Sequence, residues 1–372
     1  MHLHHQWLGL ADAFDSMMAA GARLRVHAQA ALVRMSRGEA PVGFIAGPAT
    51  PHRVVEDGPL ARLLHYRARG AARATPILVV ASLINRYYVL DLLPELSVID
   101  QLCGHGFDVF VLDWKAPGED GPERGFDDYL DGAIAAAART AAAHSPSGGG
   151  RVGMLGYCMG GTMAAIYAAR HPKTLRWLAL LGTPIDFHQS GRLAEWTRPE
   201  RFDAGLLMDV FGNMPPWLMQ SGFKLLNPAD AVAKLVRLHQ NGGDEQTIRQ
   251  FVALESWLDD NLAFPGGVYR EYIQRLYQDN ALVRGGLRVG GRPVDLAELT
   301  APLLDVVALR DHICAPPSSR ALLPLVGSAD KQLLEFDTGH IGLTTSRRSH
   351  TELWPRIIAW MEERSSAAGG AG

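Results

Sequence analysis

The chain has 372 residues, of which 47% are hydrophobic and 20% are charged, and its formal net charge at neutral pH is −3. This is the composition of a globular protein with a large core, so disulfide or metal staples are not needed for stability. The small net charge provides no positive field for a nucleic-acid partner, and the three cysteines suit a reducing compartment better than a disulfide framework.

The first part of the chain, residues 1–50, predicts an amphipathic helix over about 8–37 followed by an arm that contains glycine and proline. The N-terminus does not have the pattern of a signal peptide, because Asp12 and Asp15 interrupt its apolar stretch. No run of eighteen apolar residues occurs, so a transmembrane helix is not expected. These features together predict a cytoplasmic protein.

Short apolar runs alternate with helical stretches beyond residue 50. Most of these runs are bounded by glycine, proline or a charge, and helical patterns separate most of them. This alternation favours an α/β fold with a mostly parallel sheet that is covered by helices on both faces. The predicted strands are 76–83, 107–114, 151–156, 177–182, 302–309 and 331–336.

One long interval, 184–300, lacks a run that is typical of a buried strand. It contains three helical stretches with aromatic and methionine faces, at 215–228, 248–261 and 269–280. We expect a helical cap over the carboxyl end of the sheet. It is inserted after the predicted strand 177–182, which we count as the sixth strand of the complete sheet. The predicted organisation is an N-terminal helix and arm at 1–50, a core at 51–183 and 301–364, a cap at 184–300 and a disordered tail at 365–372.

The segment LGYCMGGT carries the pattern Gly-x-Cys-x-Gly around Cys158. This is the nucleophile-elbow pattern of α/β-hydrolases, with cysteine in the usual place of serine. A predicted strand ends at Gly156 and a helix begins near Met159, so Cys158 would occupy a strained turn at a helix N-terminus that favours the thiolate. An inert cysteine in a glycine-rich turn is the alternative, and the strand before and the helix after favour a nucleophile.

A nucleophilic thiol needs a base, and the base needs an orienting acid. In this fold the chain order is nucleophile, acid, histidine. Asp311 directly follows one predicted strand and His340 directly follows the next one. The carboxyl ends of strands are where such sheets build their sites. The sequence therefore predicts a catalytic triad of Cys158, Asp311 and His340.

An acyl-transfer site also needs donors for the developing oxyanion. We expect the backbone N–H of Met159 to be one donor, and the backbone N–H of Ile84, in the loop after the strand at 76–83, to be the second. Asn85 could cap the helix that follows this loop. Cys103 and Cys314 have no elbow context and are expected to be packing residues. No metal site is predicted.

In chain order, the motifs INRYYVLDL, VLDWKAPG, GYCMGGT, TPIDF, RDHI and GHIG resemble those of the polyhydroxyalkanoate synthases. The resemblance covers most of the chain, from about residue 50 to about residue 361. Within this family, the chain is similar to the short, class III-like catalytic subunits that depend on a partner. The resemblance implies the α/β-hydrolase fold and an acyltransferase.

The resemblance also implies a reaction. The substrate would be a (3R)-hydroxyacyl-CoA, whose thioester is attacked by the Cys158 thiolate so that CoA leaves; no cofactor is expected beyond this leaving group. His340 would remove the thiol proton, and Asp311 would orient His340 and, as in the family, help to activate the incoming 3-hydroxyl. That hydroxyl would attack the acyl-cysteine and extend a polyester. A thioester intermediate keeps the activation of acyl-CoA, which explains why the nucleophile is a thiol.

The implied partners are a smaller second synthase subunit of the PhaE or PhaR type and a second copy of the chain in a homodimer. The expected location is the cytoplasm, at the surface of polyester granules. Two other functions are open on the residues alone. One is a cysteine hydrolase of the dienelactone-hydrolase type, against which the long interval 184–300 argues. The other is an inactive granule-binding homologue, against which the intact triad argues.

Overall fold

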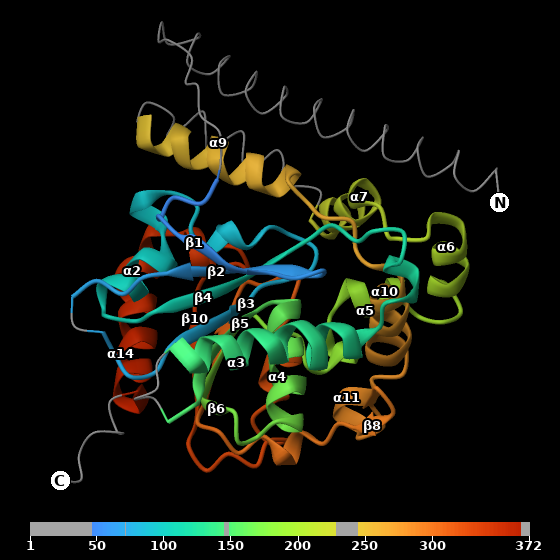
Figure 1. Ribbon diagram of the computed structural model, residues 1–372. Helices are drawn as coiled ribbons and strands as arrows, with labels where there is room; N and C mark the ends of the chain where they lie inside the picture. The colour runs from blue at the N-terminus through green and yellow to red at the C-terminus, as the bar shows by residue number, and fades with distance from the viewer. Residues whose placement is uncertain (1–46, 71, 145–148, 228–244, 366–372) are drawn as a thin grey trace, which may run out of the picture.

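The computed structural model describes residues 47–70, 72–144, 149–227 and 245–365 (Figure 1). The helix predicted over 8–37 lies outside the described residues, as does the predicted tail after Ser365. Ser365 itself ends helix α14, and its buried hydroxyl accepts a hydrogen bond from Trp177 Nε1 at 3.0 Å.

The centre of the molecule is an eight-stranded sheet with the order β1-β2-β4-β3-β5-β6-β9-β10. β1 pairs antiparallel with β2, and β2 pairs antiparallel with β4, whereas all other neighbouring strands are parallel. The predicted mostly parallel sheet is therefore confirmed. The strands are β1 (Arg53–Asp57), β2 (Ala61–Tyr66), β3 (Ile77–Val80), β4 (Val109–Trp114), β5 (Val152–Tyr157), β6 (Leu175–Leu181), β9 (Leu303–Ala308) and β10 (Lys331–Phe336).

The two N-terminal strands of the sheet, β1 and β2, were not among the strands expected from the sequence. β1 is an edge strand that is exposed along most of its length, and even Val54 is 49% accessible. The sequence criterion was a continuous apolar run, which is typical of parallel strands buried on both faces. An exposed antiparallel edge strand does not meet this criterion.

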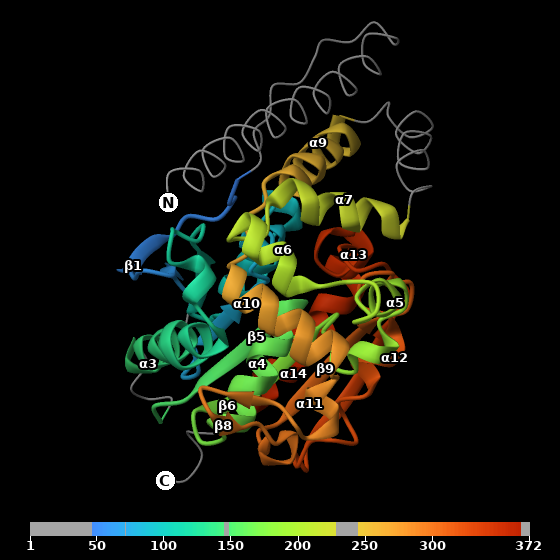
Figure 2. The ribbon, with the colours of Figure 1, turned by 90° about the vertical axis from the view of Figure 1, so that its right-hand side faces the viewer.

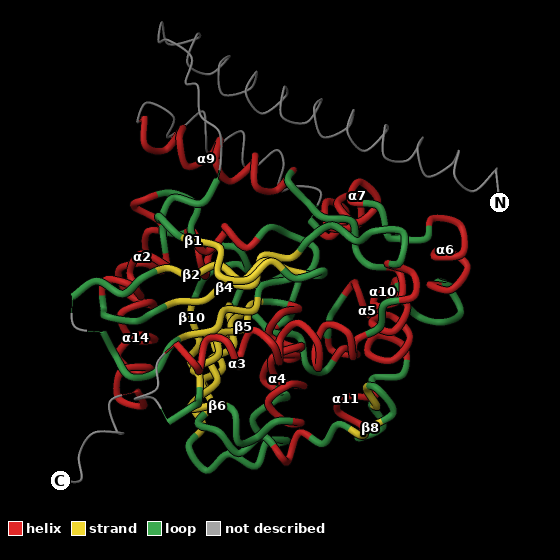
Figure 3. Tube along the Cα trace, in the orientation of Figure 1, coloured by secondary structure: helices red, strands yellow, loops and turns green. Residues whose placement is uncertain are grey.

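Helices cover both faces of the sheet, as Figures 1 and 3 show. Alternate residues of a strand point to opposite faces, so Leu78 and Val80 of β3 enter one core while Ile77 and Val79 enter the other. The first core is shared with α3 (Ala135–His144) and α4 (Met159–Arg170). The second is shared with α2 (Val98–Gly104) and α14 (Trp354–Ser365).

A cap follows the sixth strand, as expected, and runs on until β9 (Figure 2). All three helical stretches predicted for it are helical in the structure. Its aromatic interior includes Phe187, Tyr272 and Tyr277, whose rings contact one another edge to face. The cap elements are α5 (Arg192–Trp196), α6 (Ala204–Phe211), α7 (Pro216–Leu226), α9 (Glu245–Asp259), α10 (Gly266–Glu271) with the π-helical turn Tyr272–Gln278, α11 (Ala281–Arg284), β7 (Arg288–Val289) and β8 (Arg292–Pro293).

Three short helices complete the structure near the sheet's carboxyl end. A 3₁₀ turn, Tyr87–Leu90, follows the loop after β3. α12 (Pro316–Arg320) follows β9, and α13 (Gly342–Thr345) follows β10. The loops that precede these turns contain Ile84, Asp311 and His340 respectively.

Candidate active site

Cys158 lies at the sharp turn between β5 and α4, where the sequence analysis expected a nucleophile elbow. Its backbone has φ 58° and ψ −130°, an unfavourable conformation for a residue with a side chain. Two hydrogen bonds hold the turn: Cys158 N–H donates to Leu181 O at 2.9 Å, and Gly161 N–H donates to Cys158 O at 2.9 Å. A methyl group at Gly160 would overlap the carbonyl oxygens of Val80 and Ala81, which explains the glycine after the nucleophile.

Asp311 and His340 meet at the carboxyl ends of the neighbouring strands β9 and β10. His340 Nδ1 lies 2.5 Å from Asp311 Oδ2, and both residues are buried. The other carboxylate oxygen, Oδ1, accepts the backbone N–H groups of Ile313 and Cys314, each at 2.8 Å. Asp311 is therefore fixed by its own loop, and it fixes the orientation of the imidazole in turn.

Tyr157 is a neighbour of His340 that the sequence analysis did not identify. Its ring stacks on the imidazole with centroids 5.1 Å apart, and its hydroxyl donates to His340 O at 3.3 Å. Tyr157 immediately precedes the nucleophile at the end of β5, but nothing in the sequence indicated that its ring would face the histidine. The stacked ring packs against one face of the imidazole and therefore hinders its rotation.

The electrostatic environment of His340 favours its protonated form. Burial by itself lowers the pKa of His340, but the negative charge of Asp311 outweighs burial, and the pKa lies well above the usual histidine value. A raised pKa makes the imidazole a stronger acceptor for the proton of a nearby thiol. Because Nδ1 faces Asp311, Nε2 is the nitrogen left for such a transfer.

Cys158 and His340 line the same small cavity, of about 70 Å³, together with Ser82 and Ile84 from the loop after β3. The cap contributes Gln220 and Phe223 of α7 and Trp257 and Leu258 of α9 to the lining of this cavity. The Cys158 thiol has no hydrogen-bond partner among the residues that the structure describes. Catalytic hydrogen bonds are often long or unformed before the substrate binds.

The two residues predicted to provide oxyanion donors are Met159, next to the nucleophile in the chain, and Ile84, in the loop after β3. Met159 is the first residue of α4, and the first N–H groups of a helix have no partner within the helix. Ile84 lines the cavity, but its N–H donates to Ser82 Oγ at 3.2 Å. The role of both backbone groups stays a prediction, and Ser82 occupies the second donor in this conformation.

The loop that contains Ile84 is bonded to the cap. Ile84 O accepts the N–H of Leu262 at 2.9 Å, and Arg86 O accepts the indole N–H of Trp257 at 2.8 Å. The Tyr88 hydroxyl donates to Asp260 Oδ2 at 2.7 Å. The loop after β3 and the cap segment 257–262 therefore form one hydrogen-bonded unit across the site.

The expectation that Asn85 caps a helix is wrong. The residue at the N-cap of the 3₁₀ turn Tyr87–Leu90 is Arg86, and no side chain caps the turn. The amide of Asn85 instead donates to the side-chain oxygen of Asn261 in the cap. This contact directs the Asn85 side chain toward the cap, and its oxygen, the atom that a helix cap would use, makes no bond to the start of the turn.

The other two cysteines have the environments of packing residues. Cys103 is 1% accessible, and burial raises its thiol pKa to about 12. Cys314 is 2% accessible, and burial raises the pKa of its thiol well above the usual value. Its sulfur lies 3.3 Å from Ser319 Oγ. A thiol that stays protonated is a poor nucleophile, and neither residue lines the cavity that contains Cys158.

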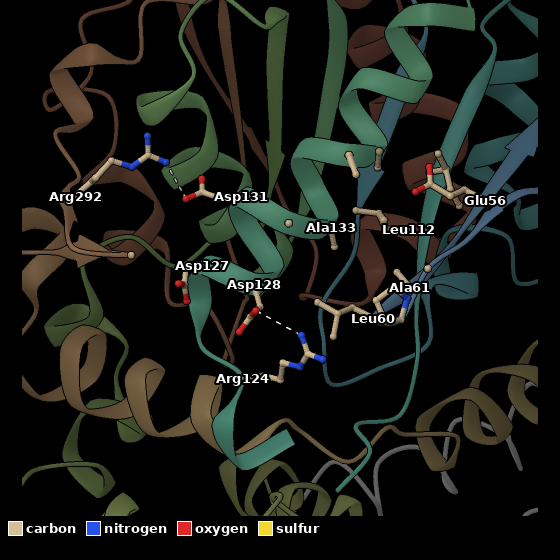
Figure 4. A pocket seen from close by; sticks show the side chains of 17 residues that line it. Glu56, Leu60, Ala61, Leu112, Arg124, Asp127, Asp128, Asp131, Ala133 and Arg292 are labelled. Atoms are coloured by element: carbon tan, nitrogen blue, oxygen red, sulfur yellow. Dashed lines mark hydrogen bonds and ion pairs between the residues drawn. The ribbon is translucent and has the colours of Figure 1, made fainter. Parts of the chain in front are cut away.

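A larger hollow, of about 440 Å³, lies between the β1–β2 hairpin, the start of the helical segment 128–144, and the β7–β8 hairpin (Figure 4). Two ion pairs lie in its lining: Arg292 with Asp131 at 2.9 Å, and Arg124 with Asp128 at 3.5 Å. It shares no residue with the cavity at Cys158 and contains no thiol or histidine. The smaller cavity, not the larger, contains groups suited to acyl transfer.

Two further observations concern the described residues alone. No group of three or more histidine, cysteine, aspartate or glutamate side chains lies close enough together there to hold a metal ion. None of the helices in the same residues is both long enough and apolar enough to span a bilayer.

Comparison with known proteins gives the family. Residues 76–345 match the family described as alpha/beta hydrolase fold, and residues 39–102 match the N-terminus of poly-beta-hydroxybutyrate polymerase (PhaC). The poly(3-hydroxyalkanoate) polymerase subunit PhaC of Allochromatium vinosum is 33% identical over 86% of this chain and 90% of its own length. The chain belongs to the poly(3-hydroxyalkanoate) polymerase family.

This membership confirms the predicted α/β-hydrolase fold and the predicted family of acyltransferase-type enzymes. The PhaC subunit of Haloferax mediterranei is 38% identical over 85% of this chain, and the match spans 64% of that relative's length. The PhaC subunit of Haloarcula marismortui is 35% identical over 86% of this chain and 69% of its own. Among solved structures, a monoacylglycerol lipase of Paleococcus ferrophilus covers 82% of this chain at 18% identity, with a TM-score of 0.48.

Proposed function

We propose that this chain polymerises (3R)-hydroxyacyl-CoA into a polyhydroxyalkanoate, with release of CoA, through an acyl group carried on Cys158. The observation that carries the proposal is a thiol on a strained elbow that shares one cavity with a histidine held by a buried carboxylate. The polymerase names of the relatives support the type of product.

The first half of the reaction loads the enzyme. His340 Nε2 accepts the proton of the Cys158 thiol, and the resulting imidazolium is stabilised by Asp311. The thiolate attacks the thioester carbonyl, and the oxyanion that forms is bound by the N–H of Met159 and, once Ser82 releases it, the N–H of Ile84. The tetrahedral species collapses by breaking the bond to the CoA sulfur, which leaves with the proton from His340.

The second half extends the polyester. The 3-hydroxyl of another acyl unit loses its proton to His340 and attacks the acyl-cysteine carbonyl, so that an oxygen ester forms and the Cys158 thiol is restored. The two thioesters have similar free energies, so the acyl-cysteine keeps the activation of acyl-CoA. Water competes with the hydroxyl, and the cap side chains over the cavity exclude it.

The cavity also supports partner dependence. A volume of about 70 Å³ is far below the several hundred Å³ of usual small-molecule pockets, so a hydroxyacyl-CoA requires the cap to move. We propose that a smaller second subunit binds the open form preferentially, and that the enzyme works at the surface of polyester granules in the cytoplasm. Homodimer contacts belong to the same proposal.

The test is a CoA-release assay with (R)-3-hydroxybutyryl-CoA, run with and without a co-purified smaller subunit and followed by analysis of the product. Polymer together with released CoA supports the proposal. Free 3-hydroxybutyrate as the sole product would identify a cysteine hydrolase instead. Absence of any CoA release, with and without the partner, would identify an inactive granule-binding homologue.

A further inference from the structure

Exposed apolar side chains are concentrated on the cap. The three most exposed large hydrophobic residues in the described parts of the chain are Leu206 (64%), Leu225 (60%) and Val210 (59%). All three lie on the cap helices α6 and α7, which Figure 2 shows beside each other. Single exposed leucines are common, whereas a concentration on adjacent helices indicates a surface that binds something.

On α6 the exposed side chains share a face, because Leu206 and Val210 are four residues apart. On α7 the exposed apolar side chain is Leu225. The rings of Phe211 and Trp217 meet edge to face with centroids 6.3 Å apart and join the two helices. We call Leu206, Val210, Phe211, Trp217 and Leu225 the cap strip.

The cap strip carries no net charge. Only two charged residues, Asp209 and Lys224, occur between positions 204 and 226. Asp209 pairs with Arg270 at 2.9 Å, and Lys224 pairs with Asp259 at 4.0 Å. Both charges are thus paired within the cap. A ligand of this surface therefore needs no charged group to bind it.

The strip lies one helix away from the nucleophile. The opposite side of α7 presents Gln220 and Phe223 to the cavity that contains Cys158. A chain that leaves the acyl-cysteine and passes α7 therefore meets the cap strip next. Continuity with the catalytic cavity selects the product among neutral apolar ligands.

We propose that the cap strip binds the polyester product. A poly(3-hydroxyalkanoate) consists of alkyl and ester groups, has no ionic charge and no N–H or O–H donor along its length, and is recognised by apolar contact. A polypeptide partner would bring charged and hydrogen-bonding groups to the rim of its interface, where the strip has its charges already paired. The identity of the polymer rests on the proposed function.

The experiment measures binding of the full-length chain to protein-free particles of amorphous poly(3-hydroxybutyrate) by sedimentation. The strip variants are Leu206→Gln with Val210→Gln on α6, and Leu225→Gln on α7. The matched control is Val54→Gln with Leu333→Gln, two apolar residues exposed on the edge strands β1 and β10. Circular dichroism and a thermal melt accompany each variant.

The α6 variant is expected to bind the particles about tenfold more weakly than the wild type, equivalent to about 1.4 kcal/mol, because two apolar side chains no longer leave water on binding. The control variant is expected to bind normally, and binding should depend little on salt. First-turnover CoA release should be unchanged in all variants, since none of these residues lines the cavity.

Wild-type binding by a folded α6 variant would overturn the inference, as would an equal loss in the control. Normal particle binding together with lost activation by a second subunit would show that the strip is the partner's surface instead. The particle assay needs no turnover. A chain that binds particles through the strip but releases no CoA would therefore contradict the proposed function alone.

Discussion

At the scale of single residues, Asp311 is placed to act through His340. Its side chain is completely enclosed, one oxygen accepts two backbone N–H groups, and the other contacts the imidazole. Asp311 does not line the cavity at Cys158. In this conformation an incoming hydroxyl reaches His340 and not Asp311, so the orienting role, rather than direct activation of the hydroxyl, is the one that the geometry favours.

Asp311→Asn should therefore reduce the first CoA release about as strongly as His340→Gln. Rapid-quench measurement of the first turnover separates this step from chain growth. A variant Asp311→Asn that acylates normally but does not extend the polymer would show that the carboxylate acts on the incoming hydroxyl.

The same substitution should change the dependence of stability on pH. The pKa of folded His340 is raised, so the pair stabilises the fold fully below the ordinary histidine pKa, and this contribution is lost as the pH rises through the raised value. The free energy of unfolding of the wild type should exceed that of Asp311→Asn by about 3 kcal/mol near pH 6, and by less at alkaline pH. Urea unfolding at several pH values measures this, and a difference that grows with pH would contradict it.

Asp305, in the middle of β9, is a buried carboxyl group outside the site. It is 1% accessible, and neither of its oxygens has a hydrogen-bond partner in the described structure. Burial raises its pKa well above the usual range. The Asp305 carboxyl group ionises at a lower pH in the unfolded chain than in the folded one. The free energy of unfolding therefore falls as the pH rises.

Asp305→Asn cannot ionise and should stabilise the chain at about pH 8, by on the order of 1–3 kcal/mol, with a smaller gain at about pH 5. Thermal or urea unfolding at both pH values provides the comparison. An equal loss of stability at both pH values would mean that the acid itself, and not its burial, is what the fold requires.

At the scale of elements, α7 separates the catalytic cavity from solvent. Phe223 faces the cavity, whereas Leu225, two residues later, is 60% exposed. A deletion of the cap segment 205–225 could test whether the cap shields the cavity from water, but it would remove Met208 and Met214, which are buried in the main core. A single substitution on α7 tests this shielding more cleanly. Phe223→Ala should admit water to the acyl-cysteine and raise the proportion of free hydroxy acid several-fold.

Ser221→Ala is the matched control for this prediction, because it changes an exposed side chain of the same helix that does not line the cavity. Its product should remain polymer. If Phe223→Ala folds normally and yields no more free acid than the control, then α7 does not protect the intermediate.

The elements themselves were largely predictable from the sequence, for a physical reason. Strands β3 to β6 and β9 are buried on both faces over most of their length, so each produces a continuous apolar run, and the elbow requires glycines at fixed places beside Cys158. The contacts of Tyr157 with His340 and of Asn85 with Asn261 were not predictable. They depend on how segments far apart in the chain approach each other, which leaves no periodic signal.

At the scale of the whole molecule, hydrogen bonds join the cap to the loop after β3, and we call this set of bonds the latch. The bonds from Leu262, Trp257 and Tyr88 join the cap to the loop that contains Ile84. Opening the cap breaks these bonds and frees the loop to rearrange. We therefore expect the isolated chain to release CoA slowly, and a partner that binds the open form preferentially to activate it.

Tyr88→Phe removes one bond of this latch without leaving the protein's core unfilled. Loss of about 1 kcal/mol from the closed form would raise the open population about fivefold. The variant should show a shorter lag and faster CoA release without the partner, and a smaller activation by it. An unchanged lag in a folded variant would count against the latch.

The central claim is that the acyl group is carried on Cys158. The most direct measurement is intact-protein mass spectrometry with peptide mapping after brief exposure to (R)-3-hydroxybutyryl-CoA. The account predicts hydroxyacyl adducts on the peptide that contains Cys158, in the wild type and in Cys314→Ser, and none in Cys158→Ser, whose CoA release should fall about 1,000-fold or more. Adducts on another residue, or wild-type turnover in Cys158→Ser, would contradict it.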